Sequence, residues 1–320
     1  MTHPRAEGVM LVAHGTVASL DEMVDFLTAI RRGRPPTPAL VEEMCRRYGA
    51  IGGSPLLSAT QRQAEALAEK VRTLVVVGMR FGRPTIEDAL REAARMRIER
   101  LVVVPMAPYS VALYFGEVRG RRWALSPEAL EFSAETSQLP FELLAIPPWG
   151  THPLLVQAHA EQIQEYAGDA LARGASLILS AHSLPMRTIE IGDQYAREVA
   201  ESAEALGRRL GCQFSLAFQS QGADGGKWLG PDLNDVVRAH AERGVSEIVV
   251  APFGFLCDHV ETLFDLDVEL KSKTDALSVK LVRVPALGTH ATLIAALAEL
   301  VAQALAPASS MRSEAEVSSC

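Results

Sequence analysis

The sequence predicts an α/β protein made of two similar halves, each with a parallel sheet flanked by helices. Short apolar runs such as residues 8–13 and 248–251 are typical of parallel strands buried on both faces. These runs alternate with helical patterns of about 10 to 15 residues, which is typical of βαβ units. An internal echo indicates two halves, because residues 11–15 (LVAHG) and 179–183 (LSAHS) both place a histidine directly after a predicted strand.

The elements follow in a regular order. Strands are predicted at residues 8–13, 73–79, 101–105, 141–146, 176–181, 213–218, 248–251 and 281–284. Helices are predicted at about residues 19–30, from the glycine turn at 50–56 to residue 70, and at 85–96, 152–172, 194–210, 232–243 and 290–304. Ser19 before Glu22 is a capping signal for the first helix. Each crossover between parallel strands is expected to be right-handed.

The length of 320 residues suits two domains of ordinary size. We expect an N-terminal half at residues 5–165 and a C-terminal half at residues 166–306, with the last helix able to pack back on the first half. The polar residues 307–320 predict a disordered tail.

Composition limits the class of protein. Hydrophobic residues make up 48% and charged residues 22%, no apolar run approaches the ~20 residues that span a bilayer, and the first residues lack the apolar core of a signal peptide. We therefore expect a cytoplasmic monomer with at most peripheral membrane contact. The net charge of −8 argues against nucleic acid as a partner. The four cysteines lack C-x-x-C spacing, so no iron–sulfur cluster is expected.

Acidic residues follow the predicted strand at 248–251. If residues 258–269 are helical, Glu261, Asp265 and Glu269 lie four apart on one face, each about 6 Å from the next. We call these three residues the acidic row. Like charges at this spacing repel, so the row is either a solvated helix face or a path for cations.

His14 and His182 each follow a predicted strand. Ligands of open α/β sheets bind beyond the carboxyl ends of strands, so either histidine is placed to act as a base or as a metal ligand. The alternative is a buried histidine with ordinary hydrogen bonds.

A basic group lies between the first two strands. Arg31, Arg32, Arg34 and Arg46 suit an anionic small molecule whose carboxylates bind guanidinium groups, although such a run is also typical of a solvated surface. Trp228, in a glycine-rich loop, either stacks on a flat ligand or pins the loop. No G-x-G-x-x-G or G-x-x-x-x-G-K-[ST] motif follows a strand, which argues against a nucleotide-dependent enzyme.

Five segments together resemble the ferrochelatase family, whose members insert ferrous iron into a porphyrin. They are residues 30–36, 52–56, 180–185, 219–231 and 258–263, in consistent order along nearly the whole chain. The resemblance implies two Rossmann-like domains with the porphyrin cleft between them, a lyase-class chelatase of heme biosynthesis, and porphyrin and ferrous iron as partners. It implies no cofactor beyond the iron substrate.

The resemblance also implies roles for individual residues. His182 and Glu261 are the expected catalytic pair, and both are expected to contact the metal, with Asp265 and Glu269 continuing the metal path. The expected porphyrin-binding residues are His14, Arg31, Arg32, Arg46, Tyr48, Ser54 and Trp228.

The chain is most similar to bacterial members of the family that lack an iron–sulfur cluster and act on coproporphyrin. It departs from them at His14, where those members carry a tyrosine. We therefore expect insertion of iron into coproporphyrin III to give coproheme III. The alternatives are protoporphyrin IX as the substrate, cobalt or sirohydrochlorin chemistry, and a non-catalytic tetrapyrrole carrier.

Overall fold

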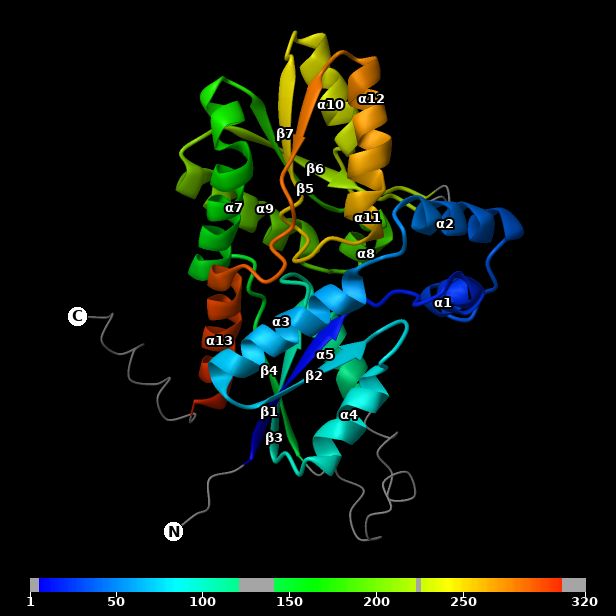
Figure 1. Cartoon of the computed structure of the whole chain (residues 1–320), viewed down its shortest axis with the longest axis vertical. Helices are drawn as coiled ribbons and strands as arrows, with labels where there is room; N and C mark the ends of the chain where they lie inside the picture. The colour runs from blue at the N-terminus through cyan, green and yellow to red at the C-terminus, as the bar shows by residue number, and fades with distance from the viewer. Residues whose placement is uncertain (1–5, 121–140, 223–225, 307–320) are drawn as a thin grey trace, which may run out of the picture.

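The computed structural model describes residues 6–120, 141–222 and 226–306. Within these residues, the first strand begins at Glu7 and the last helix ends at Leu305. The two halves lie one above the other in Figure 1, each built on a sheet with helices on its faces. The predicted tail at residues 307–320 lies outside the described residues.

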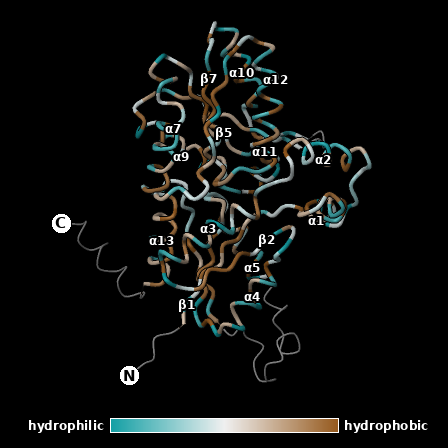
Figure 2. The backbone as a smooth tube through the Cα atoms, in the orientation of Figure 1, coloured by the Kyte–Doolittle hydropathy of each residue, from teal (hydrophilic) through white to brown (hydrophobic). Residues whose placement is uncertain are grey.

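Both sheets contain four parallel strands in the same order. The first is ordered β2-β1-β3-β4 and the second β6-β5-β7-β8. Their strands are β1 (Glu7–Ala13), β2 (Leu74–Met79), β3 (Arg100–Pro105), β4 (Glu142–Ala145), β5 (Ser176–His182), β6 (Phe214–Gln219), β7 (Glu247–Ala251) and β8 (Lys280–Arg283). The predicted strands and the two-sheet α/β class are confirmed. The strands are apolar, as Figure 2 shows, because helices cover both of their faces.

Alternation along β1 divides the core of the first half. Val9 and Leu11 pack with the helices α3 (Leu56–Val71) and α13 (Ala291–Leu305), whereas Met10 and Val12 pack with α4 (Ile86–Arg95). The helices of this half are α1 (Met23–Ile30), α2 (Pro38–Ala50), α3 (Leu56–Val71), α4 (Ile86–Arg95) and α5 (Val111–Gly120), with a 3₁₀ turn at Leu20–Glu22. The sequence did not predict α2 or α5. Helix α2 begins at Pro38, where the hydroxyl of Thr37 accepts the backbone N–H of Leu40.

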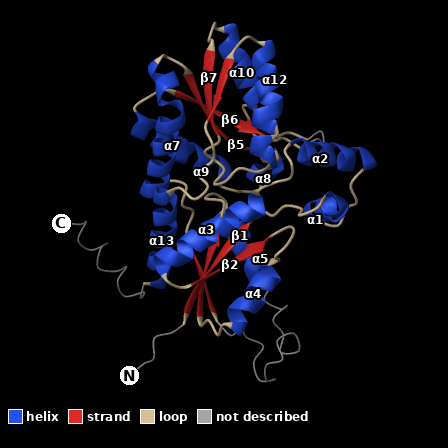
Figure 3. Ribbon diagram, in the orientation of Figure 1, coloured by secondary structure: helices blue, strands red, loops and turns tan. Residues whose placement is uncertain are grey.

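The second half repeats this plan, as Figure 3 shows. Its helices are α7 (Pro153–Ala172), α8 (Met186–Glu190), α9 (Tyr195–Leu210), α10 (Leu233–Glu242), α11 (Val260–Leu263), α12 (Lys271–Ala276) and α13 (Ala291–Leu305). Between α11 and α12 the chain forms a π-helical turn at Asp265–Leu270. Leu266 and Leu270 of this turn pack into the core of the second sheet, which directs the acids between them outward.

Helix α13 packs on the first half. Leu293 and Leu297 share a core with Leu11 and Val104 of the first sheet. The boundary predicted between residues 165 and 166 falls inside α7, which is continuous from Pro153 to Ala172. The halves are therefore joined by packed helices rather than by an exposed linker.

The helices that follow the last strand of each half, α7 and α13, contact one another through the histidines at their N-termini. Both begin after the letters GTH, and the histidine side chain of each motif accepts a backbone N–H of its own helix. His152 Nε2 lies 3.5 Å from Glu299 Oε2 of α13, and His290 Nε2 lies 3.7 Å from Glu161 Oε2 of α7. The reciprocal contacts fix how the halves meet. Among the described residues, no helix is long and apolar enough to cross a membrane.

Candidate active site

The two residues predicted as catalytic are in contact. His182 ends β5, and Glu261 lies on α11, which follows the end of β7. His182 Nε2 lies 3.4 Å from Glu261 Oε2, and the side chains are 32% and 30% exposed. In Figure 1, α8 and α11 lie between the levels of the two sheets. The pair is therefore positioned at strand ends and is open to a ligand.

A second histidine shares the same carboxylate oxygen. His259 Nε2 lies 3.5 Å from Glu261 Oε2, and the ring of Phe255 packs between His259 and His182 with centroid distances of 5.0 and 6.5 Å. The sequence analysis did not list His259 as a site residue, although it stands two residues before Glu261. The spacing alone did not show that both side chains turn to the same point.

The electrostatics of this cluster favour separated charges. Burial alone would raise the pKa of Glu261, but the charges and hydrogen bonds of His182 and His259 outweigh it and hold that pKa well below its usual range. Burial lowers the pKa of His182, but the charge and hydrogen bond of the Glu261 carboxylate, together with Ser183 and Asp265, outweigh it, so the net shift is upward. Glu261 is therefore ionised at neutral pH and available to a proton or a cation.

Buried hydrogen bonds hold both backbones in place. The amide of Gln219 donates to the backbone carbonyl of Glu261 at 2.7 Å and accepts the hydroxyl of Ser180 at 2.8 Å. The hydroxyl of Tyr195 donates to the backbone carbonyl of His182 at 2.8 Å. These contacts tie the ends of β5 and β6 to α11, so the distance between the catalytic pair depends on buried groups.

The acidic row lies partly in the π-helical turn rather than in one regular helix. The backbone N–H of Glu269 bonds to the carbonyl of Phe264 at 3.0 Å, the five-residue spacing of a π-helix. Arg47 of α2 lies 3.0 Å from Asp265 and 3.6 Å from Glu269. An arginine from the first half therefore offsets the repulsion in the row, a role that the sequence analysis assigned to water or cations.

The pKa of the Asp265 carboxyl lies above the usual range of an aspartate. Burial raises its pKa to about 6, and the negative charges of Glu261 and Glu269 add to this shift, while Ser220 and Arg47 oppose it. The Ser220 hydroxyl donates to this carboxylate. Asp265 can therefore exchange a proton near neutral pH, next to an ionised Glu261.

His14 belongs to the same electrostatic cluster. Burial lowers its pKa to about 4; Glu261 opposes this shift, and the charges of His182, Arg80 and His259 add to it. The residue nevertheless keeps an exposed surface. The ring meets Phe81 edge-on at 5.0 Å. The imidazole is therefore neutral at working pH and can act as a ligand.

Gly15 explains how His14 reaches this place. Its φ is +103°, and a Cβ at this position would lie 1.5 Å from the carbonyl oxygen of Phe81. Only glycine allows the chain to turn here directly after β1.

The predicted basic group is divided. Arg31 is half-buried, and its Nε is a buried donor with no hydrogen-bond partner among the described residues. Arg32 is exposed in a left-handed conformation. Arg46 is held by two hydrogen bonds of 2.8 Å to Glu43 and stacks on Phe264. Arg31 is therefore the member of the group with a buried donor that has no partner among the described residues.

Three other predicted porphyrin-binding residues have contacts of their own. Tyr48 is 3% exposed and shares a hydrogen bond of 3.0 Å with Thr16. The Ser54 hydroxyl accepts the backbone N–H of Leu56 at the start of α3. The Trp228 ring lies against Gly222, the contact expected of a side chain that pins its loop. Porphyrin contacts for all three stay predictions.

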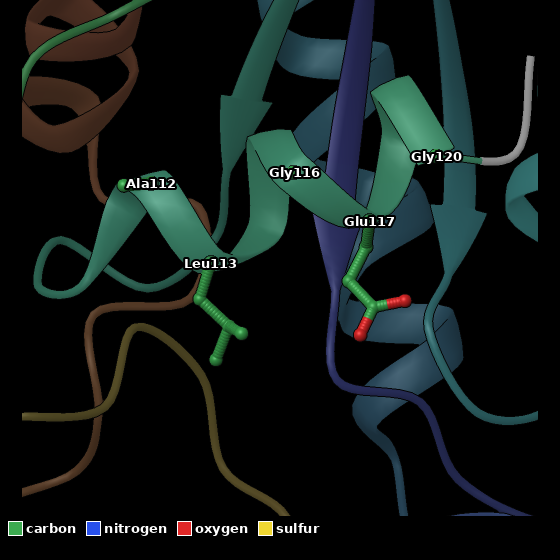
Figure 4. Close-up of a pocket in the computed structure, with 5 residues that line it drawn as sticks. All are labelled: Ala112, Leu113, Gly116, Glu117 and Gly120. Atoms are coloured by element: carbon green, nitrogen blue, oxygen red, sulfur yellow. The ribbon is translucent and has the colours of Figure 1, made fainter. Parts of the chain in front are cut away.

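One hollow borders the acidic row, and another lies along α5. A polar hollow of about 220 Å³ is lined by Arg47, Ser220, Asp265 and Glu269, at the outer end of the acidic row. A larger hollow of about 520 Å³ lies along α5, where Figure 4 shows Leu113 and Glu117 on one side of the helix.

The four residues predicted to contact the metal are not gathered at one point. Within the described ranges, no group of three or more His, Cys, Asp or Glu side chains is arranged to hold a metal ion. His182 and Glu261 face one another, whereas Asp265 and Glu269 face Arg47. The metal roles of these residues stay predictions.

Comparison with known proteins identifies relatives along nearly the whole chain. A family model described as Ferrochelatase matches residues 6–305. The chain is 33% identical to the coproporphyrin III ferrochelatase of Anoxybacillus flavithermus, covering 92% of this chain and 95% of the relative. It is also 33% identical to the ferrochelatase of Deinococcus radiodurans, covering 94% and 96%.

Solved structures support the fold. SirB from Bacillus subtilis, solved with Fe³⁺, superposes with a TM-score of 0.55 at 13% identity, covering 94% of this chain and 96% of that one. CbiX, described as the terminal enzyme of siroheme biosynthesis in denitrifying bacteria, gives a TM-score of 0.51 at 17% identity, covering 93% and 100%. At these identities the similarity concerns the two-sheet architecture alone.

Proposed function

Because the chain belongs to the ferrochelatase family, a family of metal-inserting lyases of heme biosynthesis, we propose that it inserts ferrous iron into coproporphyrin III to give coproheme III. The contact of 3.4 Å between His182 and Glu261 carries the site assignment. The coproporphyrin III ferrochelatase names of relatives at 31–33% identity favour the tetracarboxylate substrate.

The chemistry requires groups of both kinds. Two pyrrole N–H protons must leave the ring, and a partly hydrated cation must reach the four nitrogens. An ionised Glu261 and the imidazole of His182 can supply a proton acceptor and a metal ligand next to one another. Asp265, with its pKa of about 6, is suited to pass protons or cations between Glu261 and the polar hollow.

Substrate choice is tested by steady-state metallation under anaerobic conditions. Coproporphyrin III and protoporphyrin IX are compared with ferrous iron, and kcat/KM is measured for each. We expect a higher value for coproporphyrin III, because its four carboxylates offer more charge-assisted contacts to arginine. A higher value for protoporphyrin IX would favour the dicarboxylate substrate instead.

The substitution Arg31→Ala is expected to weaken coproporphyrin III more than protoporphyrin IX, by about 1–3 kcal/mol for a lost charge-assisted contact. The reason is the buried Nε of Arg31, which has no partner among the described residues. Porphyrin dissociation constants measure the effect. Arg46→Ala should matter less, because Glu43 already holds that guanidinium.

A matched control for Arg31→Ala is available on α10. Arg238→Ala removes an exposed arginine that pairs within its own helix, with Asp235, and it should leave both dissociation constants unchanged. Equal losses for the two porphyrins in Arg31→Ala would show that Arg31 does not select the substrate.

The substitution His14→Leu is expected to speed release of the iron porphyrin and to remove the absorbance features of a histidine-ligated heme. A neutral imidazole is a stronger iron ligand than a phenol, and the low pKa of His14 keeps it neutral. Stopped-flow release rates and product spectra test this expectation. Matching spectra and rates in the parental protein and the variant would mean that His14 never ligates the iron.

The proposal also covers localisation, oligomeric state, cofactors and partners. We propose a cytoplasmic monomer that needs no cofactor beyond substrate iron, has no iron–sulfur cluster, binds no nucleic acid and makes at most peripheral membrane contact. A non-catalytic tetrapyrrole carrier is the alternative class of function, and it predicts heme binding without metallation.

A further inference from the structure

Arg283, the last residue of β8, binds two aspartates in the segment that carries Glu261. Its Nε and Nη2 donate to the two carboxylate oxygens of Asp267 at 2.8 and 2.6 Å. Its Nη1 lies 3.0 and 3.2 Å from the two carboxylate oxygens of Asp258. The arginine side chain is only 12% exposed. A planar guanidinium that binds two carboxylates in this way forms a rigid arrangement that lysine cannot reproduce.

The two aspartates lie on opposite sides of Glu261 in the chain. Asp258 precedes His259, and its carboxylate accepts the hydroxyl of Thr262 at 2.9 Å. That hydroxyl oxygen accepts the backbone N–H of His259 at 3.0 Å. Asp267 lies in the π-helical turn. Arg283 therefore fixes the start and the end of the segment from the neighbouring strand.

The negative charge of residues 258–269 explains why the contacts of Arg283 matter. Residues 258–269 contain five carboxylates, and two arginines bind four of them. The pairs are Arg283 with Asp258 and Asp267, and Arg47 with Asp265 and Glu269. The fifth carboxylate is Glu261, which faces the imidazoles. Without Arg283, repulsion between like charges and the greater stability of a regular α-helix would both favour another path for the segment.

We propose that Arg283 is a positioning residue for metal insertion, which keeps Glu261 within reach of His182 by fixing the segment on both sides of it. The inference rests on the proposed function, because it concerns the rate of the same reaction. A misplacement of about 1 Å in a reacting geometry can cost on the order of a hundredfold in rate. A shift of that size would separate the Glu261 and His182 atoms that now lie 3.4 Å apart.

The test compares Arg283→Gln and Arg283→Lys in the full chain. Anaerobic insertion of ferrous iron into coproporphyrin III gives kcat, and a porphyrin titration gives the dissociation constant. We expect kcat to fall about 10- to 100-fold in Arg283→Gln, with porphyrin affinity within about twofold of the parental value. Arg283→Lys should recover only part of the rate, because it restores the charge without the planar fork.

A control and a second variant complete the design. Arg173→Gln breaks an exposed ion pair with Glu247 of β7 and should leave kcat unchanged. Asp267→Asn weakens the contact of the Arg283 guanidinium with its more exposed partner and keeps the contact with Asp258. This variant tests the inference if Arg283→Gln does not fold. A several-fold loss of kcat with unchanged porphyrin affinity is expected for Asp267→Asn.

Two results would overturn the inference while the proposed function stands. One is that the parental protein inserts iron and the Arg283 and Asp267 variants insert it with the same kcat. The other is a loss of rate in these variants that follows entirely from weaker porphyrin binding. A parental protein that inserts no iron would overturn the proposed function and this inference together.

Discussion

Replacing His182 with alanine is expected to abolish iron insertion while leaving porphyrin binding nearly intact. The imidazole acts at the ring nitrogens in this account, together with Glu261 at 3.4 Å, and not at the peripheral carboxylates. An acid–base group usually carries about 10²- to 10⁴-fold in rate, so the variant should retain less than about a hundredth of the parental rate. Anaerobic metallation rates and porphyrin titrations measure both quantities.

A buried histidine outside the site serves as the control for His182→Ala. His240 is 9% exposed and hydrogen-bonds Ser215 in the same half of the chain, on α10. His240→Ala should lower stability while the folded protein keeps its insertion rate. A His182→Ala variant that metallates at more than about a hundredth of the parental rate would contradict its assigned role.

Neutralising Glu261 is expected to have the second largest effect, within a graded series. Glu261→Gln should cripple turnover by about 10²-fold or more, because it removes the charge shared by both imidazoles. Asp265→Asn and Glu269→Gln should mainly raise the apparent KM for iron, since these residues face Arg47 at the outer end of the row. Steady-state kinetics with varied iron separates the two effects.

The series also tests the alternative reading of the acidic row. Equal and small effects at all three positions would mean that the row is a solvated helix face. The paired contacts of Arg47 predict instead that the three substitutions differ, because only Glu261 lies against the histidines.

The strands could be predicted from the sequence for physical reasons, whereas the central pair was implied by the family resemblance. A parallel strand covered on both faces needs a continuous apolar run, as residues 248–251 show, and each run here became a strand. The resemblance to ferrochelatases implied that His182 and Glu261 act as a pair, and the structure brings their side chains into contact.

Features that depend on contacts between distant residues could not be predicted. The π-helical turn forms ion pairs with Arg47 and Arg283, which lie far from it in the sequence. Helix α2 carries two adjacent arginines near its end, and these basic side chains suggested a binding surface rather than a helix. Tyr48, expected among the porphyrin-binding residues, is buried and hydrogen-bonds Thr16, a contact that an aromatic residue in a basic run does not reveal.

The most direct test of the central claim is one anaerobic absorbance experiment. Coproporphyrin III is bound to the parental protein, ferrous iron is added, and the visible bands of the free-base porphyrin are followed over a single turnover. The account predicts that these bands are replaced by those of the iron porphyrin in the parental protein and persist in His182→Ala with porphyrin still bound. Tight binding of porphyrin or heme by the parental protein, with free-base bands that persist after iron is added, would contradict it and indicate a tetrapyrrole carrier.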